Sequence, residues 1–316
     1  MTVGTVITEF GRCGHDLARP ECVLATQSGR LFVSDRRGGV TCIEPDGRQH
    51  RLGTSALVPN GIALQRDGSF LVADLGEQGG VWRIDAQGAV QPWLMEFEGR
   101  RLPRVNYVTT DEQERTWICI SATKTDDQYP LDDATGCILL HDRHGVRLVA
   151  DGLRYTNEIR LHPDGASVYV NETFGRRLSR LRMAADGTLT ARATVAEFDG
   201  PGDFPDGLAL DAEGGVWVVC VGSNRVYRVD RDGRREVVVD DADPETADRL
   251  ERAFTARELT RPMLGAARGR QLRNITSLAF TGPDLRTACM GSLSADSLAT
   301  FHSPVPGLRP AHWHWS

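Results

Sequence analysis

Hydrophobic and polar residues alternate along most of the chain in short runs that end at turn residues, which is typical of β-strands joined by tight turns. One arrangement recurs six times: a polar residue, an alternating apolar stretch, a turn and a second apolar stretch. The copies are ECVLATQSGRLFVSD (21–35), NGIALQRDGSFLVAD (60–74), NYVTTDEQERTWICI (106–120), NEIRLHPDGASVYVN (157–171), DGLALDAEGGVWVVC (206–220) and TSLAFTGPDLRTACM (276–290). Each copy predicts a strand, a tight turn and a second strand.

A second signal follows each copy roughly twenty to thirty residues after its start. It alternates apolar and polar residues and ends in Asp-Gly or a similar turn, which marks a half-buried strand that enters a hairpin. The segments are GVTCIEPDG, GVWRIDAQG, GCILLHDRHG, RLSRLRMAADG, RVYRVDRDG and SLATFHSPVPG. An outer strand such as RREVVVD is predicted to follow each turn, which predicts six units of about four antiparallel strands.

Repeated four-stranded units of this size predict an all-β fold, a six-bladed β-propeller of four-stranded antiparallel blades, as a single domain over residues 1–316. Radial packing lets neighbouring blades cover the apolar faces that one sheet would leave exposed. The N-terminal TVITEF (5–10) is predicted to form the outermost strand of the blade whose inner strands come from the C-terminus. This pairing would close the ring.

Two segments depart from the repeat. Residues 241–273 lengthen one unit, and Pro244 after Asp243, with the i,i+4 pair Leu250 and Phe254, predicts a helical insertion. The polar connection over 121–136 is long enough to hang over one mouth of the ring.

The polar residue that opens each unit has a common geometric meaning. The innermost strand of a propeller blade lines the central channel, so the residue at its start points toward the axis at one end of the ring. Two carboxylates and two amides would then point to one place, from Glu21, Asn106, Asn157 and Asp206. Such a set of oxygen donors suits Ca²⁺, with Mg²⁺ or Mn²⁺ possible and Zn²⁺ less well matched. The six positions are Glu21, Asn60, Asn106, Asn157, Asp206 and Thr276. The alternative is that such residues only satisfy turn backbone, and Asn60 fits that alternative best.

Charge and composition narrow the function and the location. The net charge is −6 without a block of like charge, which argues against a nucleic-acid partner. No run approaches the roughly 18 apolar residues of a membrane span, and the N-terminus lacks the pattern of a secretory signal. Seven cysteines without a CxxC pair indicate free thiols. We therefore expect a cytoplasmic protein without membrane or nucleic-acid partners, as a monomer or small homo-oligomer.

Familiar nucleophile motifs do not occur in the sequence. There is no GxSxG, HExxH or Walker loop, and Cys13 in GRCGH has no partner pattern. The histidines, including those of the terminal AHWHWS, are interpreted as solvated or structural.

The segments NEIRLHPDGASVYVNET and FPDGLALDAEGGVWV resemble the gluconolactonase/regucalcin (senescence marker protein) family and, more distantly, diisopropyl fluorophosphatase. The resemblance covers essentially the whole chain. It implies a divalent metal, usually Ca²⁺ and in some members Zn²⁺ or Mn²⁺, held by residues that match Glu21, Asn157 and Asp206. It further implies that Asn106 contacts the metal or the bound substrate and water, and it matches Arg104 to an arginine often found two residues earlier.

Two departures from the family pattern bear on the substrate. The usual Glu-Gly-Pro is Glu21-Cys22-Val23, and an acidic residue often found after the second Asn is Tyr107. A substrate close to gluconolactone is therefore in doubt. A Tyr107 side chain beside the site would favour a less polyhydroxylated ligand; the alternative is that it packs between blades.

These observations lead to the hypothesis of metal-dependent hydrolysis of a sugar-derived lactone or a related small cyclic ester. Asp206 would take the proton of the attacking water, while Asn106, Arg104 and Tyr107 would bind the substrate. Three alternatives stay open: a phosphotriesterase or aryl esterase that uses the same metal, a non-hydrolytic enzyme such as an isomerase or a strictosidine-synthase-type catalyst, and a non-enzymatic Ca²⁺-binding or interaction propeller.

Overall fold

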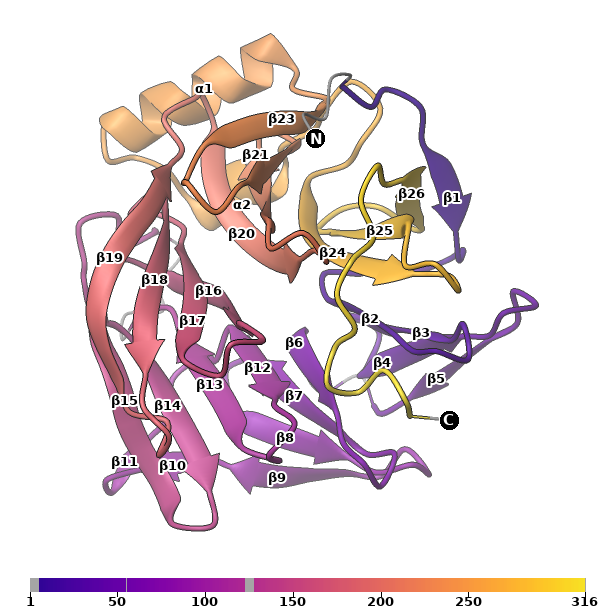
Figure 1. The fold of residues 1–316 in the computed structure, drawn as a ribbon, viewed down its shortest axis with the longest axis vertical. Helices are drawn as coiled ribbons and strands as arrows, with labels where there is room; N and C mark the ends of the chain where they lie inside the picture. The colour runs from indigo at the N-terminus through magenta and orange to yellow at the C-terminus, as the bar shows by residue number, and fades with distance from the viewer. Residues whose placement is uncertain (1–5, 55, 123–127, 316) are drawn as a thin grey trace.

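The protein is a ring of six four-stranded antiparallel sheets around a central axis, as Figure 1 shows. The computed structural model describes residues 6–54, 56–122 and 128–315. Within each sheet the strands follow chain order from the axis outward, except that the last sheet takes its outermost strand from the N-terminus. The predicted six-bladed β-propeller is confirmed.

The first three blades run from Val23 to Leu153. Their strands are β2 (Val23–Ala25), β3 (Leu31–Ser34), β4 (Val40–Ile43) and β5 (Gln49–Leu52); β6 (Pro59–Leu64), β7 (Phe70–Asp74), β8 (Val81–Ile84) and β9 (Val90–Leu94); and β12 (Tyr107–Thr110), β13 (Thr116–Ile120), β14 (Gly136–Asp142) and β15 (Gly145–Leu153). A small extra hairpin, which the repeat pattern did not predict, joins the second and third blades through β10 (Glu96–Phe97) and β11 (Arg100–Arg101).

The last three blades complete the ring. Their strands are β16 (Thr156–Leu161), β17 (Ser167–Glu172), β18 (Arg177–Met183) and β19 (Leu189–Glu197); β20 (Asp203–Leu210), β21 (Val216–Gly222), β22 (Arg225–Val229) and β23 (Arg235–Asp240); and β24 (Ile275–Thr281), β25 (Thr287–Ser292), β26 (Leu298–His302) and the N-terminal β1 (Gly11–Cys13).

The ring closes through β1, a few residues later than predicted. Gly11 pairs with Thr300 and Cys13 with Leu298, so the N-terminus completes the blade begun by the C-terminal strands. The placement of this strand at TVITEF was wrong for its described residues. Ile7 instead forms a parallel bridge to Val239 of the fifth blade and packs against the apolar core there. Thr5, the first residue of TVITEF, lies outside the described residues.

A repeated aspartate fixes the turn between the two inner strands of five blades. Its carboxylate accepts a hydrogen bond from the backbone N–H two residues later, a standard way for Asp to stabilise a turn. These residues are Asp67, Asp111, Asp164, Asp211 and Asp284. Asp211 does more, because it also accepts from Trp217 Nε1 at 2.9 Å and Arg228 Nε at 2.6 Å inside the core.

Replacement of Asp211 with Ala should therefore destabilise the fold strongly. The buried Trp217 N–H and the largely buried Arg228 would both lose their acceptor, and we expect a loss of about 3 kcal/mol in the free energy of unfolding. Urea denaturation measures this change. Asp46→Ala, at an exposed turn, should leave the denaturation midpoint nearly unchanged; equal effects of the two substitutions would contradict the argument.

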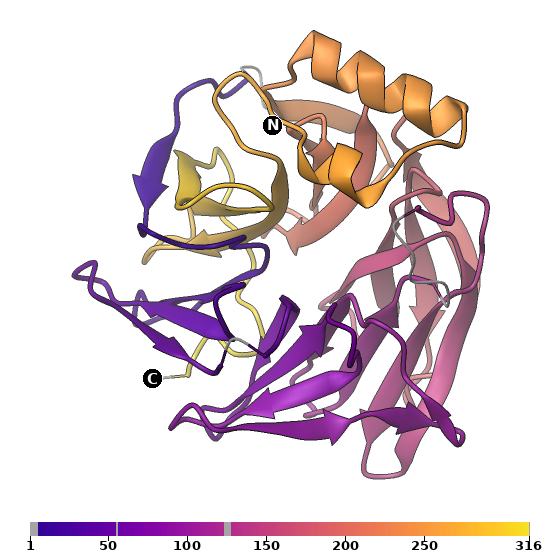
Figure 2. The same ribbon diagram turned by 180° about the vertical axis from the view of Figure 1, so that it is seen from behind.

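The predicted helical insertion is confirmed and lies on one face of the ring (Figure 2). It contains α1 (Pro244–Thr255) and α2 (Arg261–Gly265), and the Asp243 side chain caps α1 by accepting from Thr246 N at 2.8 Å. The connection predicted to hang over a mouth docks on this insertion: Tyr129 N donates to Leu259 O, and Asp132 pairs with Arg257 at 2.7 Å. Residues 123–127 of that connection lie outside the described residues.

The C-terminal segment crosses the opposite end of the channel, as the yellow trace in Figure 1 shows. Trp313 O accepts from Gln27 N at 2.8 Å and Leu210 O from Leu308 N at 2.9 Å, both where innermost strands end. The Trp315 ring packs edge-on against Phe32. Access to the starts of the innermost strands is therefore from the face that carries the helical insertion.

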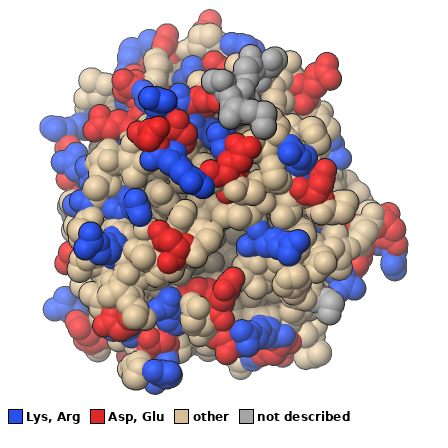
Figure 3. All heavy atoms as spheres, viewed as in Figure 1, with Lys and Arg blue, Asp and Glu red and all other residues tan. Residues whose placement is uncertain are grey.

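The surface on the side of the C-terminal segment mixes acidic and basic side chains rather than gathering one sign (Figure 3). Among the described residues, neither helix is long and apolar enough to cross a membrane.

Candidate metal centre

The polar residues that open the units stand in β-bulges. In four blades, two successive paired positions are three residues apart on the innermost strand but only two residues apart on its partner. The innermost strand therefore has one extra residue there, which bends it toward the axis. The steps run from Pro59 to Ile62, Thr156 to Ile159, Pro205 to Leu208 and Ile275 to Leu278. Asn60, Asn157, Asp206 and Thr276 each lie inside such a bulge, and this shared kink is the geometric cause of the repeated position.

The glycine that follows two of these residues is required by close packing at the axis. A Cβ on Gly61 would lie 2.6 Å from the Tyr107 ring, and one on Gly207 would lie 2.4 Å from Thr276 O. Neighbouring innermost strands therefore approach closely, which only glycine permits. The Asn-Gly and Asp-Gly pairs belong to these bulges and are not hairpin turns.

Glu21 is held by polar side chains of two other blades. The Asn60 amide donates to Glu21 Oε1 at 3.0 Å and to Asn106 Oδ1 at 3.2 Å. The hydroxyl of Thr276 donates to Glu21 O at 2.8 Å. The Asn60 side chain thus links Glu21 to Asn106 and is not a simple turn residue, while Thr276 holds the Glu21 backbone.

Asn157 and Asp206 lie on the facing side of the channel. Asn157 Nδ2 donates to the Thr173 hydroxyl at 3.0 Å, which directs Oδ1 away from Thr173. Asn171 Nδ2 donates to Asp206 O at 3.0 Å and so holds the bulge that carries Asp206. The Asn157 side chain lies beside the Asp206 carboxylate, where it partly offsets the rise that burial and the neighbouring carboxylates cause in the Asp206 pKa. The structure therefore brings Asn157 and Asp206 together.

The two carboxylates of the site are electrostatically strained in the protein alone. Burial, together with the charge of Glu158, raises the pKa of Glu21 to about 8, although Arg19 and the Asn60 hydrogen bond oppose the shift. Burial and the charges of Glu21 and Glu158 raise the pKa of Asp206 well above its ordinary range. Glu21 and Asp206 are therefore close enough to repel each other, and one cation between them would relieve the repulsion.

The donor set fits a divalent cation. Glu21 Oε2 and Asn157 Oδ1 are buried and have no hydrogen-bond partner among the residues that the structure describes. A buried polar oxygen without a partner costs free energy, and coordination of a hard cation would remove that cost.

The two remaining predicted site residues, Arg104 and Tyr107, are close to Asn106 in the sequence but differ in their surroundings. Arg104 is half-buried on the connection into β12, and its charge partly offsets the rise that burial causes in the pKa of Asp74. Tyr107 is 2% exposed, packs in the core and receives a hydrogen bond from Arg160, which in turn pairs with Glu158 at 2.9 Å. Their contact with a substrate stays a prediction.

Three residues of the site were missed in the sequence. Asn60 was attributed to a turn because Asn-Gly is common there. Glu158 accepts a hydrogen bond from Leu208 N of the next blade at 3.0 Å. The sequence does mark this residue, because Glu158 stands at the second position of its unit, where two other units have glycine. Arg19 donates to Asn60 Oδ1 at 2.7 Å, and it lies just before the first unit, where the repeat gives no signal.

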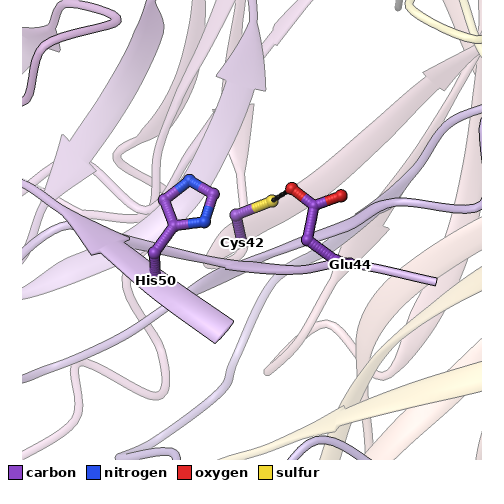
Figure 4. Close-up of side chains that lie close together, drawn as sticks. All are labelled: Cys42, Glu44 and His50. Atoms are coloured by element: carbon purple, nitrogen blue, oxygen red, sulfur yellow. Dashed lines mark hydrogen bonds between the residues drawn. The ribbon is translucent and has the colours of Figure 1, made fainter. Parts of the chain in front are cut away.

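A second cluster of metal-ligand types lies on the outer strands of the first blade, away from the channel (Figure 4). Cys42 and His50 are cross-strand partners, and their ligand atoms lie within 4.8 Å of each other and of a Glu44 oxygen. Glu44 already pairs with Arg30 at 2.9 Å, and burial with the Glu44 charge raises the pKa of Cys42 to about 12. The protonated thiol makes this cluster a weaker candidate than the channel site.

Comparison with known protein families shows to which family this chain belongs. Residues 20–242 match the family model described as the SMP-30/Gluconolactonase/LRE-like region. The chain belongs to this family. A relative named adipocyte plasma membrane-associated protein, from Homo sapiens, is 26% identical over 205 residues, which are 63% of this chain and 40% of that protein. The chain thus spans less than half the length of the curated relatives it matches.

Solved structures of this family share the fold. A calcium-binding protein, regucalcin, from Agrobacterium tumefaciens is 20% identical, with a TM-score of 0.71 and 99% of each chain covered. A gluconolactonase from Xanthomonas campestris is 19% identical, with a TM-score of 0.67, over 93% of this chain and 88% of that one. At identities of 19% and 20%, the similarity shows a shared fold and no more than that.

Proposed function

We propose that the protein is a divalent-metal-dependent hydrolase that opens a lactone. The observation that carries this proposal is the pair of buried oxygens, Glu21 Oε2 and Asn157 Oδ1, that have no partner among the described residues, next to the buried Asp206 carboxylate. Glu21, Asn157 and Asp206 would hold the cation, with Ca²⁺ as the first candidate because all donors are oxygens. Membership in the family and the fold shared with a gluconolactonase and with the calcium-binding protein regucalcin support this choice.

When bound, the cation polarises the ring carbonyl and stabilises the charge that develops on its oxygen. Asp206 takes a proton from water as the water oxygen bonds to the carbonyl carbon. The ring C–O bond then breaks, and the leaving oxygen receives the proton that Asp206 took, which gives the open hydroxy acid and restores the carboxylate. Asp206 would be ionised for this role with a divalent charge beside it, because that charge would offset the burial and the repulsion that raise its pKa.

Two polar residues would orient the substrate. Asn106 Oδ1 is engaged by Asn60, so its Nδ2 is the group that can donate to a substrate oxygen. Arg104 would bind a hydroxyl or carboxylate at the edge of the site. Tyr107, with its ring in the core, would support this wall of the channel through Arg160.

An activity screen of metal-depleted protein tests the proposal. Sugar lactones, aliphatic lactones, aryl esters and phosphotriesters would each be supplied with Ca²⁺, Zn²⁺, Mn²⁺ or Mg²⁺ in turn. We expect lactone opening that disappears with a chelator and returns with one of these ions. Turnover of phosphotriesters but not lactones, or turnover that survives complete metal removal, would contradict the proposal.

A further inference from the structure

Arg19 occupies a tight turn that aims its side chain at the candidate metal centre. Its carbonyl accepts from Glu21 N at 2.8 Å across Pro20, so residues 19 and 21 project to the same side. The Asn60 amide then bridges them, with Oδ1 on Arg19 and Nδ2 on Glu21. Arg19 has a φ of 50°, in the left-handed region that a non-glycine residue adopts at a cost. Such positions cluster at functional sites.

The charge of Arg19 is held in place without being neutralised. Its guanidinium donates to two neutral acceptors, Asn60 Oδ1 at 2.7 Å and Pro59 O at 3.1 Å. Over the described part of the chain it forms no ion pair with a carboxylate. The side chain is half-buried, so part of Arg19 remains exposed to solvent. A fixed guanidinium with donors to spare is suited to bind a carboxylate.

The balance of charges favours an anionic ligand. A divalent cation would balance Glu21 and Asp206, and Arg160 already balances Glu158. The positive charge of Arg19, held beside Glu21 through Asn60, is not part of this balance. Because the site is largely buried, this charge acts on a ligand with little screening.

Tyr129 marks where such a ligand would lie. Burial raises the pKa of the Tyr129 hydroxyl, and the charges of Asp206 and Arg19 are among the groups that act on it, so Tyr129 belongs to the surroundings of these two residues. Arg261 stacks on this ring at 4.7 Å and donates to the Tyr155 hydroxyl at 3.2 Å. The ligand would therefore meet a flat aromatic wall instead of a polar surface suited to several hydroxyls.

We propose that Arg19 selects lactones that carry a carboxylate next to the ring, so that the preferred substrate class is an acidic lactone and not a neutral sugar lactone. This inference rests on the proposed lactone hydrolysis. It assigns a specificity residue at a position where neither the repeat nor the family resemblance indicated one.

Matched substrates test this inference. A carboxymethyl-substituted γ-lactone and its methyl ester share the same ring and differ only in the charge of the side group. We expect wild-type kcat/KM to be higher for the acid, and Arg19→Gln to lower the acid-to-ester ratio by about 30-fold, mainly through KM. Arg19→Lys should recover part of the ratio, and Arg51→Gln, at an exposed arginine of the same blade, should keep it. A ratio is independent of the folded fraction of each variant.

The outcomes separate the two proposals. An unchanged ratio in Arg19→Gln, or a wild-type preference for the ester, would overturn the role of Arg19 while lactone hydrolysis stands. If neither lactone is opened, calorimetric binding of the corresponding γ-lactam carboxylate still decides the point. We expect wild-type protein to bind it and Arg19→Gln to bind it at least about 10-fold more weakly; equal binding would refute the inference.

Discussion

Replacement of Asp206 with Asn should lower kcat for lactone opening by about 1,000-fold, because an amide cannot accept the proton of the attacking water. Asn keeps one oxygen at the same place, so the bulge held by Asn171 and the overall fold should persist. The rate with saturating metal is the decisive measurement. A loss that saturating Ca²⁺ fully repaired would show that Asp206 acts only as a ligand.

The control for this substitution is Asp46→Asn, at an exposed turn outside the site. Its kcat should equal that of the wild-type protein. Circular dichroism of Asp206→Asn should match the wild-type spectrum. An Asp206→Asn enzyme within about fivefold of wild-type kcat would contradict the assignment of Asp206 as the base.

Glu21→Gln should make the metal-free protein more stable at pH 8, although it damages the site. The folded-state pKa of Glu21 is about 8, raised from an ordinary value of 4.5 mainly by burial. The stability that this bound proton contributes is present below about pH 4.5 and is lost as the pH rises through about 8. Gln carries no such proton and also removes a charge that repels Asp206. We expect the melting temperature of the metal-free variant at pH 8 to exceed that of wild-type protein by about 3 °C or more.

Added metal should reverse this order. Binding to the wild-type protein neutralises both carboxylates and raises its melting temperature, most strongly at high pH where the ligands are ionised. The Glu21→Gln protein lacks one anionic ligand and should respond little. Scanning calorimetry with and without Ca²⁺ at pH 6 and pH 8 measures the four values. A metal-free wild-type protein more stable than the variant at pH 8 would contradict the electrostatic account.

The fold was predictable because each blade repeats the same alternation of apolar and polar residues, and alternation reports which strand faces are buried. The closing strand was misplaced for the same reason. TVITEF alternates as a strand does, but Ile7 uses its apolar side chain to bridge to Val239, while the less regular Gly11–Cys13 completes the ladder. Pairing between chain ends depends on the closed ring, which no local pattern records.

The candidate site was predictable to the extent that it follows the repeat. Glu21, Asn106, Asn157 and Asp206 occupy equivalent positions, and the ring brings them to one end of the channel. Bulges could not be read from the sequence, since an extra residue in a ladder is visible only against its partner strand. Arg19 stands outside the repeat, and its relation to Asn60 spans two blades.

Calorimetric titration of metal-stripped protein with Ca²⁺ tests most directly whether the closed ring gathers its oxygen donors around a single cation. The account predicts one ion per chain for wild-type protein, at least about 100-fold weaker binding for Glu21→Gln, and unchanged binding for Glu44→Gln in the outer cluster. Wild-type affinity in Glu21→Gln, or loss of binding in Glu44→Gln alone, would contradict it.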